Sequence, residues 1–225
     1  PSFRPTLATV HRVYNETKKL VKQEVEIKER KRIRRVGTAL VITPSWDSRQ
    51  ILVARDVSPA RGDVGKPYGS LSLPMGFSKR GEGEKAILRV LQQEVFTGKL
   101  LESPAEFNKK AIELIDGSGP FMFIDIADVR VAVHHLILPR EFSSQDSFSS
   151  FKLKGFKFVD AEELLHAGEG ILLRQGMREI AHGYKEYRVS LAEELEPQPF
   201  YVDSFFNQRV ALLVTEESVQ ICIRK

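Results

Sequence analysis

The sequence has a single cysteine, Cys222, among its 225 residues, and it has no apolar run long enough to cross a bilayer. One thiol cannot form a disulfide within the chain, which argues against a disulfide-stabilised secreted scaffold. We expect Cys222 to be a buried strand residue and the protein to be soluble, with no membrane partner. The chain begins at Pro1 rather than at a methionine, so we expect a missing upstream segment, for which a transit peptide is one possibility.

Several common catalytic motifs are also absent. The glycines in "GEGE" (81–84) lack the spacing of a dinucleotide-binding fingerprint, and no Lys-Ser/Thr pair follows them as in a P-loop. No Ser- or Cys-based triad can be assembled, because the serines lie in predicted loops and the cysteine lies near the end of the chain. Nucleophilic catalysis by the protein is therefore not indicated.

The charge is unevenly distributed along the chain. The chain carries 34 Lys and Arg against 30 Asp and Glu, a formal charge of +4, and nine of the basic residues lie between Lys18 and Arg35, against three Glu. Such a basic run can neutralise phosphates and give salt-sensitive binding to nucleic acid. A solvent-exposed helix or edge strand is an equally good interpretation of this run by itself.

Hydrophobic patterning predicts an α/β protein. Apolar runs at 36–45 and 51–57 predict strands that pair as a hairpin, and further strands are predicted at 121–127 and 129–138. Residues 156–167 predict a strand, an N-cap at Asp160 and a helix; a second helix is predicted from about 171 to 195, broken near Gly183. A hairpin closes the chain at 210–225. We predict an α/β/α sandwich at 36–195, a basic N-terminal extension (1–35) and a C-terminal strand extension packed on the same domain (196–225).

The most informative stretch is "SLPMGFSKRGEGEKAILRVLQQEVFTG" (72–98), a glycine-bearing turn followed by a predicted helix from about Gly83 to Phe96. On a helical wheel, Glu94 falls inside the apolar arc formed by Ala86, Ile87, Leu88, Val90, Leu91 and Val95. An unpaired buried carboxylate is costly, so we expect a cation, a metal or several hydrogen-bond donors beside it. The alternative is that the helix frays before Glu94 and lets it reach water.

The turn before this helix is suited to phosphate or metal binding. Pro74, Gly76 and Gly81 allow tight backbone geometry, so that exposed N–H and C=O groups can approach a ligand. Together with a carboxylate one helical length away, the turn predicts a site for a magnesium-bound phosphate. Four nearby cations could contact the phosphates, although each alone also suits an ordinary surface role: Arg55, Lys66, Lys79 and Arg80.

The stretch resembles the signature of the Nudix family: Gly, five residues, Glu, seven residues, then Arg-Glu-aliphatic-x-Glu-Glu-x-Gly-aliphatic. Gly76 and Glu82 match with the right spacing, Arg89 comes one residue early, and Gly98 comes two residues late. Leu91 fits the aliphatic position and Glu94 fits the second Glu of the pair. Val90 and Gln93 replace the other two acids. The order of predicted elements from about 33 to 182 resembles the family as well, but only the signature is specific.

The resemblance implies a Nudix-like mixed sheet flanked by helices and a site for Mg²⁺ or Mn²⁺, here weakened by the missing acids. In that family, helix carboxylates and a turn carbonyl bind the metals that polarise a pyrophosphate for attack by water. Carried over to this chain, the expected metal ligands are Glu94, Gly76 and Glu84, with Glu141 as a less favoured addition. The expected catalytic residues are Glu94, Gln93 and Glu82, and the expected substrate-binding residues are Arg55, Lys66, Lys79, Arg80, Tyr68 and Phe77.

Within the family, the altered acids most resemble Nudix factors of kinetoplastid mitochondria associated with the 5′-triphosphate ends of mitochondrial mRNA. One implied function is a pyrophosphohydrolase that binds nucleoside triphosphates and RNA 5′ ends and releases pyrophosphate in the mitochondrial matrix. A second is an impaired nucleotide- or RNA 5′-end-binding subunit that uses basic groups and an aromatic stack; Tyr68, Phe77 and Phe123 are stacking candidates whose ordinary role is packing. A third is a structural subunit with protein partners in an RNA-processing or ribosomal assembly.

Overall fold

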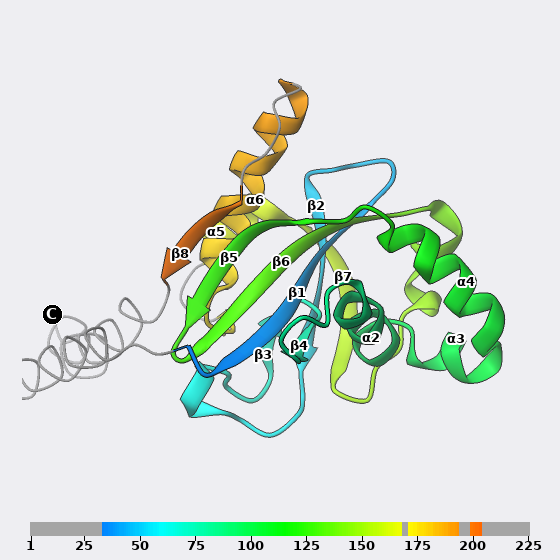
Figure 1. Cartoon of the computed structure of the whole chain (residues 1–225), viewed down its shortest axis with the longest axis horizontal. Coiled ribbons are helices and arrows are strands. Elements are labelled where there is room, and N and C mark those ends of the chain that lie inside the picture. The colour runs from blue at the N-terminus through cyan, green and yellow to red at the C-terminus, as the bar shows by residue number, and fades with distance from the viewer. Residues whose placement is uncertain (1–32, 168–170, 194–198, 204–225) are drawn as a thin grey trace, which may run out of the picture. The chain divides into compact units, whose positions relative to one another are not determined.

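The computed structural model describes residues 33–167, 171–193 and 199–203 (Figure 1). Most of the basic run, Cys222 and the hairpin predicted at 210–225 lie outside these residues. Contacts divide the chain into a unit formed by 33–202 and a unit formed by 1–32 and 203–225. The second unit lies almost wholly outside the described residues, so only the first is described below.

Two sheets form the centre of this unit. The five-stranded sheet has the order β4 (Met75–Ser78), β1 (Arg35–Pro44), β6 (Val129–Leu138), β5 (Pro120–Ile126) and β8 (Phe200–Asp203). Its strand β1 runs parallel to β6 and antiparallel to β4. The three-stranded sheet has the order β3 (Ser70–Ser72), β2 (Gln50–Asp56) and β7 (Leu153–Asp160), and both of its pairings are antiparallel.

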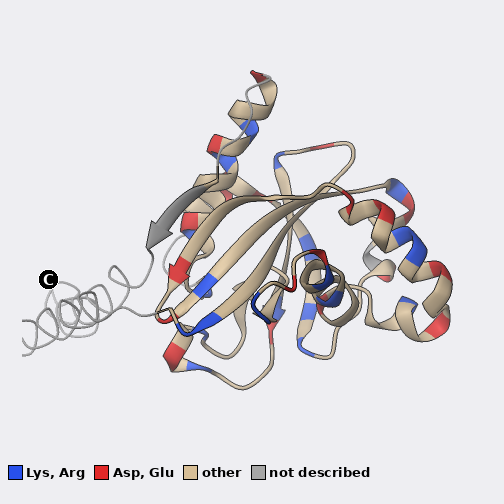
Figure 2. Cartoon of the chain, viewed as in Figure 1, with Lys and Arg blue, Asp and Glu red and all other residues tan. Residues whose placement is uncertain are grey.

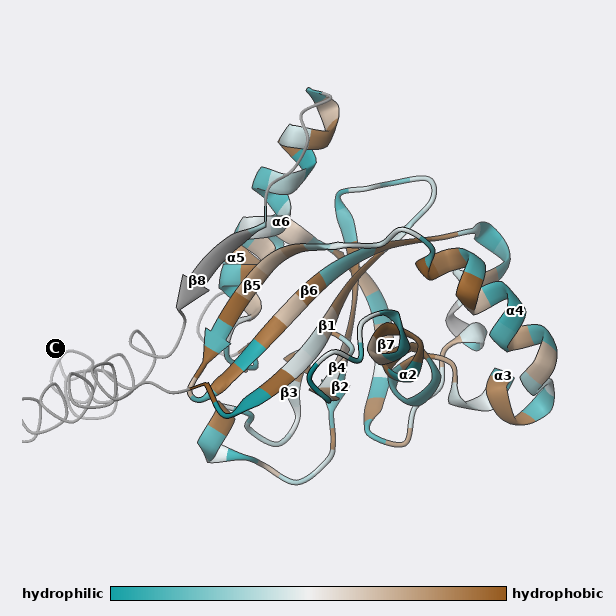
Figure 3. Cartoon of the chain, viewed as in Figure 1, coloured by the Kyte–Doolittle hydropathy of each residue, from teal (hydrophilic) through white to brown (hydrophobic). Residues whose placement is uncertain are grey.

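Helices cover the sheets in two groups (Figure 1): α2 (Glu84–Glu94), α3 (Thr97–Glu102) and α4 (Pro104–Ile115) in one, and α5 (Ala161–Leu165) and α6 (Met177–Ala192) in the other. Side chains that alternate along β1 feed two separate cores. Ala39 and Val41 pack in the cluster that contains α6, whereas Leu40 and Ile42 pack in the cluster that contains α2 and α4. Hydrophobic residues accordingly concentrate on the central strands (Figure 3). The predicted α/β class, a mixed sheet flanked by helices, is confirmed.

Most local predictions agree closely with the structure. The strand and helix predicted around Asp160 form as β7 and α5, and the Asp160 carboxylate accepts a hydrogen bond of 2.9 Å from the Glu162 amide as an N-cap. Helix α2 reaches Glu94, as the wheel required. Short 3₁₀ turns occupy the loops at Gly62–Val64, Arg140–Phe142 and Gln145–Ser147. None of the described helices is long and apolar enough to span a bilayer.

Two predictions of secondary structure were wrong. Strands β1 and β2 do not form a hairpin but belong to different sheets, because β1 pairs with β4 on one edge and β6 on the other. Helix α6 begins only at Met177, after Gly176 in a left-handed conformation, and it continues unbroken through Gly183. Gly183 is buried within the helix, so packing offsets the low helix propensity of glycine. Helices α3 and α4 were not predicted.

Candidate functional site

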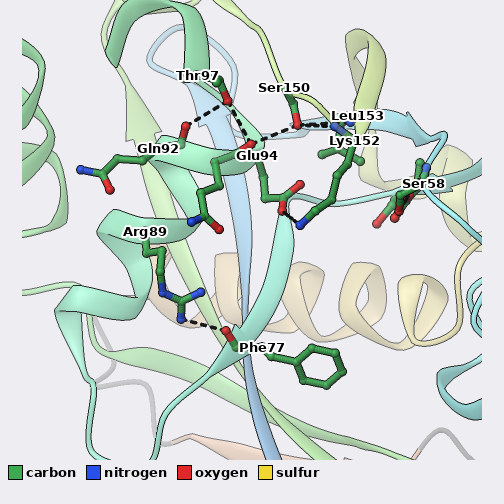
Figure 4. A network of polar contacts seen from close by, with 12 residues as sticks. Ser58, Phe77, Arg89, Gln92, Glu94, Thr97, Ser150, Lys152 and Leu153 are labelled. Atoms are coloured by element: carbon green, nitrogen blue, oxygen red, sulfur yellow. Dashed lines mark hydrogen bonds and ion pairs between the residues drawn. The ribbon is translucent and has the colours of Figure 1, made fainter. Parts of the chain in front are cut away.

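Arg89 fixes the turn that precedes α2. Its guanidinium donates to the Glu82 carboxylate at 2.8 and 3.1 Å. It also donates to the Phe77 carbonyl at 2.8 Å (Figure 4). Glu82 also accepts a hydrogen bond from the Lys79 amide at 2.8 Å. These bonds, first from Arg89 and then from Lys79, lower the pKa of Glu82 to about 2. Glu82 and Arg89 thus hold the glycine-bearing turn against the helix.

Glu94 is a buried carboxylate with a cation as its partner. Only 3% of the residue is exposed, and its Oε1 accepts a hydrogen bond from the Lys152 ammonium at 2.6 Å (Figure 4). Lys152 comes from the segment just before β7, and half of its side chain is exposed. The prediction that a buried Glu94 needs a charged neighbour is confirmed, and the alternative that the helix frays before Glu94 is wrong.

A cavity of about 200 Å³ lies beside this pair, and both Glu94 and Lys152 line it. Four cations and two carboxylates contribute to its wall: Arg61, Lys66, Lys152, Arg174, Asp56 and Glu94. Apolar side chains, among them Met75 and Val131, form much of the remainder. Figure 2 shows Lys and Arg residues at the start of β1 and along β7. The excess of cations favours an anionic ligand.

The floor of the cavity carries a buried charged group formed by Asp56, Lys66 and Arg174. The Lys66 ammonium donates to the Asp56 carboxylate at 3.2 Å, to the Ser58 hydroxyl at 2.6 Å and to the Ser58 carbonyl at 3.2 Å. Asp56 and Lys66 are 3% and 5% exposed. Burial raises the pKa of Asp56, but hydrogen bonds from Ser58 and Lys66 outweigh it, so the pKa lies below its ordinary value. Asp56 is therefore ionised at neutral pH.

The Arg174 guanidinium completes this floor and makes few polar contacts. Its Nη1 lies 3.6 Å from an Asp56 carboxylate oxygen, and within the described part of the chain its guanidinium makes no hydrogen bond. Burial lowers the pKa of the Arg174 guanidinium, against the opposing attraction of Asp56 and Glu94. An Arg side chain nevertheless stays charged in proteins, so a cation with unused donors faces the cavity.

The predicted site residues fall into three groups. Gly76, Phe77, Lys66 and Glu94 line the cavity. Lys79, Arg80 and Glu82 line a separate hollow at the start of α2. The remaining predicted residues line neither hollow: Arg55, Tyr68, Glu84, Gln93, Phe123 and Glu141. The Gln93 and Glu84 side chains are exposed, so they lie away from the buried Glu94 carboxylate.

Sequence reasoning missed Asp56, Lys152 and Arg174, which define the charge of the cavity. Asp56 ends an apolar strand, a position that can carry functional side chains, and it could have been considered on that ground. Lys152 and Arg174 belong to no recognisable motif. Each meets its carboxylate only through contacts between distant segments, as the separation of 58 residues between Lys152 and Glu94 illustrates.

The residues present do not fit the divalent metal site that the Nudix resemblance implies. Among the described residues no group of three or more His, Cys, Asp or Glu side chains could hold a metal ion. Hard cations such as Mg²⁺ are held mainly by several anionic oxygens. Here Glu94 is the only predicted metal-binding carboxylate at the cavity, and the Lys152 ammonium already neutralises it.

The sequence matches no protein-family model and no curated protein. Solved structures with a similar course of the chain include DR0079 from Deinococcus radiodurans, at 16% identity over 68% of this chain and 83% of that protein, with a TM-score of 0.46. A MutT protein from Methanosarcina mazei has 12% identity over 70% and 94% of the two chains and a TM-score of 0.45. An ADP-ribose pyrophosphatase from Streptococcus suis has 12% identity over 74% and 98%, with a TM-score of 0.44.

Proposed function

We propose that this chain binds the phosphorylated end of a nucleotide or an RNA in the cavity beside Glu94, and that it does so without a divalent metal. The observation that carries the proposal is the 2.6 Å contact between the Lys152 ammonium and the Glu94 carboxylate. This contact supplies the positive charge that a bound metal would otherwise bring to Glu94. The resemblance to the Nudix signature at Gly76, Glu82 and Glu94 supports the choice of a phosphate-containing ligand.

Lys152 is suited to contact both Glu94 and a ligand. An ammonium has three N–H donors, and the bond to Glu94 uses one of them. Half of the Lys152 side chain is exposed while Glu94 is buried, so the lysine lies on the solvent side of the pair. A phosphate at the mouth of the cavity can therefore accept a charge-assisted hydrogen bond from Lys152 without breaking the contact with Glu94.

On the basis of the sequence resemblance, the proposal includes RNA 5′ ends in mitochondria as ligands and protein partners in an RNA-processing assembly. A triphosphate end suits the cavity because it carries more negative charge than an end with fewer phosphates, and the wall has four cations and two carboxylates. The basic run at residues 18–35 would add salt-dependent contacts to the RNA backbone.

Slow removal of pyrophosphate from 5′-triphosphate RNA is the second candidate function. The observation in its favour is that Glu94 and Gly76, two expected metal ligands, line the same cavity. The ion pair between Arg89 and Glu82, which fixes the turn between β4 and α2, also preserves part of the signature.

One experiment separates the two functions. The wild-type chain, Glu94→Gln and Lys152→Gln are incubated with 5′-triphosphate RNA and magnesium or manganese, and both RNA retention and pyrophosphate release are measured. We expect wild-type binding without pyrophosphate release, and binding weakened at least about tenfold by Lys152→Gln, since bonds between charged groups are worth about 1.5–3 kcal/mol. Lys109→Gln, a neutralised exposed lysine on α4, serves as the control for lost charge.

Pyrophosphate release that requires Glu94 would support the slow hydrolase instead. Equal release by wild-type and Glu94→Gln would remove Glu94 from the reaction. If the wild-type chain retained neither 5′-triphosphate RNA nor nucleoside triphosphates, the proposed binding function would be wrong.

A further inference from the structure

We infer that the cavity accepts only terminal phosphates, with Arg174 receiving the outermost phosphate at its floor. The ligand would then be a free 5′-phosphorylated end, and neither an internal phosphodiester nor a pyrophosphate joined to a nucleoside at both ends. This inference rests on the proposed function, because it names the part of the ligand that the same cavity recognises.

The first observation concerns the unused donors of Arg174. Only 15% of its side chain is exposed, and among the described residues the guanidinium makes one ion pair, at 3.6 Å with Asp56, and no hydrogen bond. A guanidinium has five N–H donors, and leaving buried donors unsatisfied is costly. Its planar fork matches two oxygens of one phosphate, so a phosphate at the floor would satisfy several of these donors together.

Lys66 cannot take this role, although it lines the same floor. Its ammonium has three donors, and three acceptors already surround it: the Asp56 carboxylate, the Ser58 hydroxyl and the Ser58 carbonyl. Lys66 thus balances the Asp56 charge. Arg174 then remains as the surplus positive charge at the floor.

The size of the cavity limits how much of a ligand can enter. Its volume of about 200 Å³ is below the range of about 300–1,000 Å³ that is usual for pockets enclosing whole small molecules. A nucleoside and its phosphates therefore do not fit together inside. Because the walls are charged with an excess of cations, the part that enters is the phosphate end.

The charged residues at the floor are buried, so the phosphate that reaches them must be the last one. Asp56 and Lys66 are 3% and 5% exposed, and Ile126 and Val131, which also line the cavity, are 4% and 5% exposed. A second nucleoside beyond the outermost phosphate would have to occupy this packed region. A capped RNA or a dinucleoside pyrophosphate therefore cannot place its pyrophosphate against Arg174.

The nucleoside remains outside the cavity, beside exposed aromatic residues. Phe151 is 79% exposed and directly precedes Lys152, whose ammonium lies at the cavity. Tyr68 is 64% exposed and is held near the floor strand by the hydrogen bond of 2.7 Å from the Gly69 amide to the Asp56 carbonyl. Base stacking on such rings tolerates any base, so recognition would depend on the phosphate end and little on sequence.

The test compares RNAs of one sequence that differ only at the 5′ end: triphosphate, hydroxyl and a 5′–5′ triphosphate-linked cap. Binding to the full chain is measured by fluorescence anisotropy in EDTA, with inorganic tripolyphosphate as the competitor. We expect the triphosphate RNA to bind at least about tenfold more tightly than the other two, and tripolyphosphate to displace it. Arg174→Gln should remove this preference, and Arg174→Lys should retain part of it.

The outcomes distinguish this inference from the proposed function. If triphosphate RNA binds but the capped RNA binds equally well, or if Arg174→Gln keeps the full preference, the inference is overturned while the binding function stands. If triphosphate RNA does not bind at all, the proposed function fails. Lys109→Gln controls for lost charge, and circular dichroism checks folding. Should Arg174→Gln not fold, the comparison of capped with triphosphate RNA on the wild-type chain decides the matter.

Discussion

The Lys152 ammonium lies 2.6 Å from the Glu94 carboxylate, and this pair connects the folding of α2 with the chemistry of the cavity. Glu94 is buried on the apolar face of the helix, beside Ile87, Val90 and Leu91, which pack in one of the two hydrophobic cores. Without a partner, its carboxylate would carry the full cost of lost solvation. The lysine therefore contributes to stability as well as to the attraction of anions.

Replacing Lys152 should destabilise the protein more than replacing Glu94 by its amide. Lys152→Met leaves a buried carboxylate without its cation and should lower the free energy of unfolding by about 1–3 kcal/mol. Glu94→Gln should cost less, because the amide oxygen can still accept from Lys152. Urea denaturation measures both, with Lys157→Met on the exposed side of β7 as the control. The reverse order of the two losses would contradict the assigned pair.

The ionisation of Glu82 should make the stability of the fold depend on pH. Its pKa of about 2 lies below the ordinary value of 4.5, so the unfolded chain takes up this proton first as the pH falls. The stabilisation by Glu82 is therefore complete above about pH 4.5 and is lost towards pH 2. Thermal midpoints of wild-type and Glu82→Gln should converge between pH 5 and pH 2.5. Parallel curves for wild-type and Glu82→Gln would argue against the pair with Arg89.

The loop between β2 and β3 positions two of the four cations of the cavity, Arg61 and Lys66. An ion pair of 2.7 Å joins Arg61 to Asp63, and a second of 2.9 Å joins Asp63 to Arg35 on β1. Further along the loop, the backbone N–H of Gln175 donates to the Gly65 carbonyl at 2.9 Å. The loop is thereby attached to both β1 and the segment before α6.

Gly65 and Gly69 in this loop provide a matched pair of substitutions. Both adopt left-handed backbone conformations, but a Cβ added at Gly65 would come within 1.9 Å of the Gln175 side chain, whereas one at Gly69 would meet nothing within 4 Å. Gly65→Ala should therefore lower the free energy of unfolding by about 1–3 kcal/mol more than Gly69→Ala, and it should weaken ligand binding. Chemical denaturation and RNA binding of the two variants test this. Equal losses would mean that Gln175 moves aside without cost.

Local sequence patterns were enough to predict α/β architecture, because the periodicities of strands and helices are properties of short segments. Helix α2 and the N-cap at Asp160 follow directly from such patterns. The pairing of β1 could not be predicted in this way. A short connection to β2 favoured a hairpin, but β4 and β6 occupy both edges of β1.

The site was predictable within the signature and at Lys66, which was predicted as a nearby cation. Gly76 and Glu94 were found by spacing and by the helical wheel, and both line the cavity. The wheel also required a cation, a metal or hydrogen-bond donors beside Glu94, but it could not identify Lys152, because that contact depends on the fold bringing the segment before β7 beside the end of α2. Arg174 was missed for the same reason, since its only described partner, Asp56, lies in a different part of the sequence.

The most direct test of the central claim is a titration of the whole chain with 5′-triphosphate RNA, once in EDTA and once in magnesium. If Lys152 and the other cations of the cavity replace the metal, the two dissociation constants should agree within about threefold, a difference of less than about 1 kcal/mol. Binding that appears only with magnesium, and is lost in Glu94→Gln, would contradict the account.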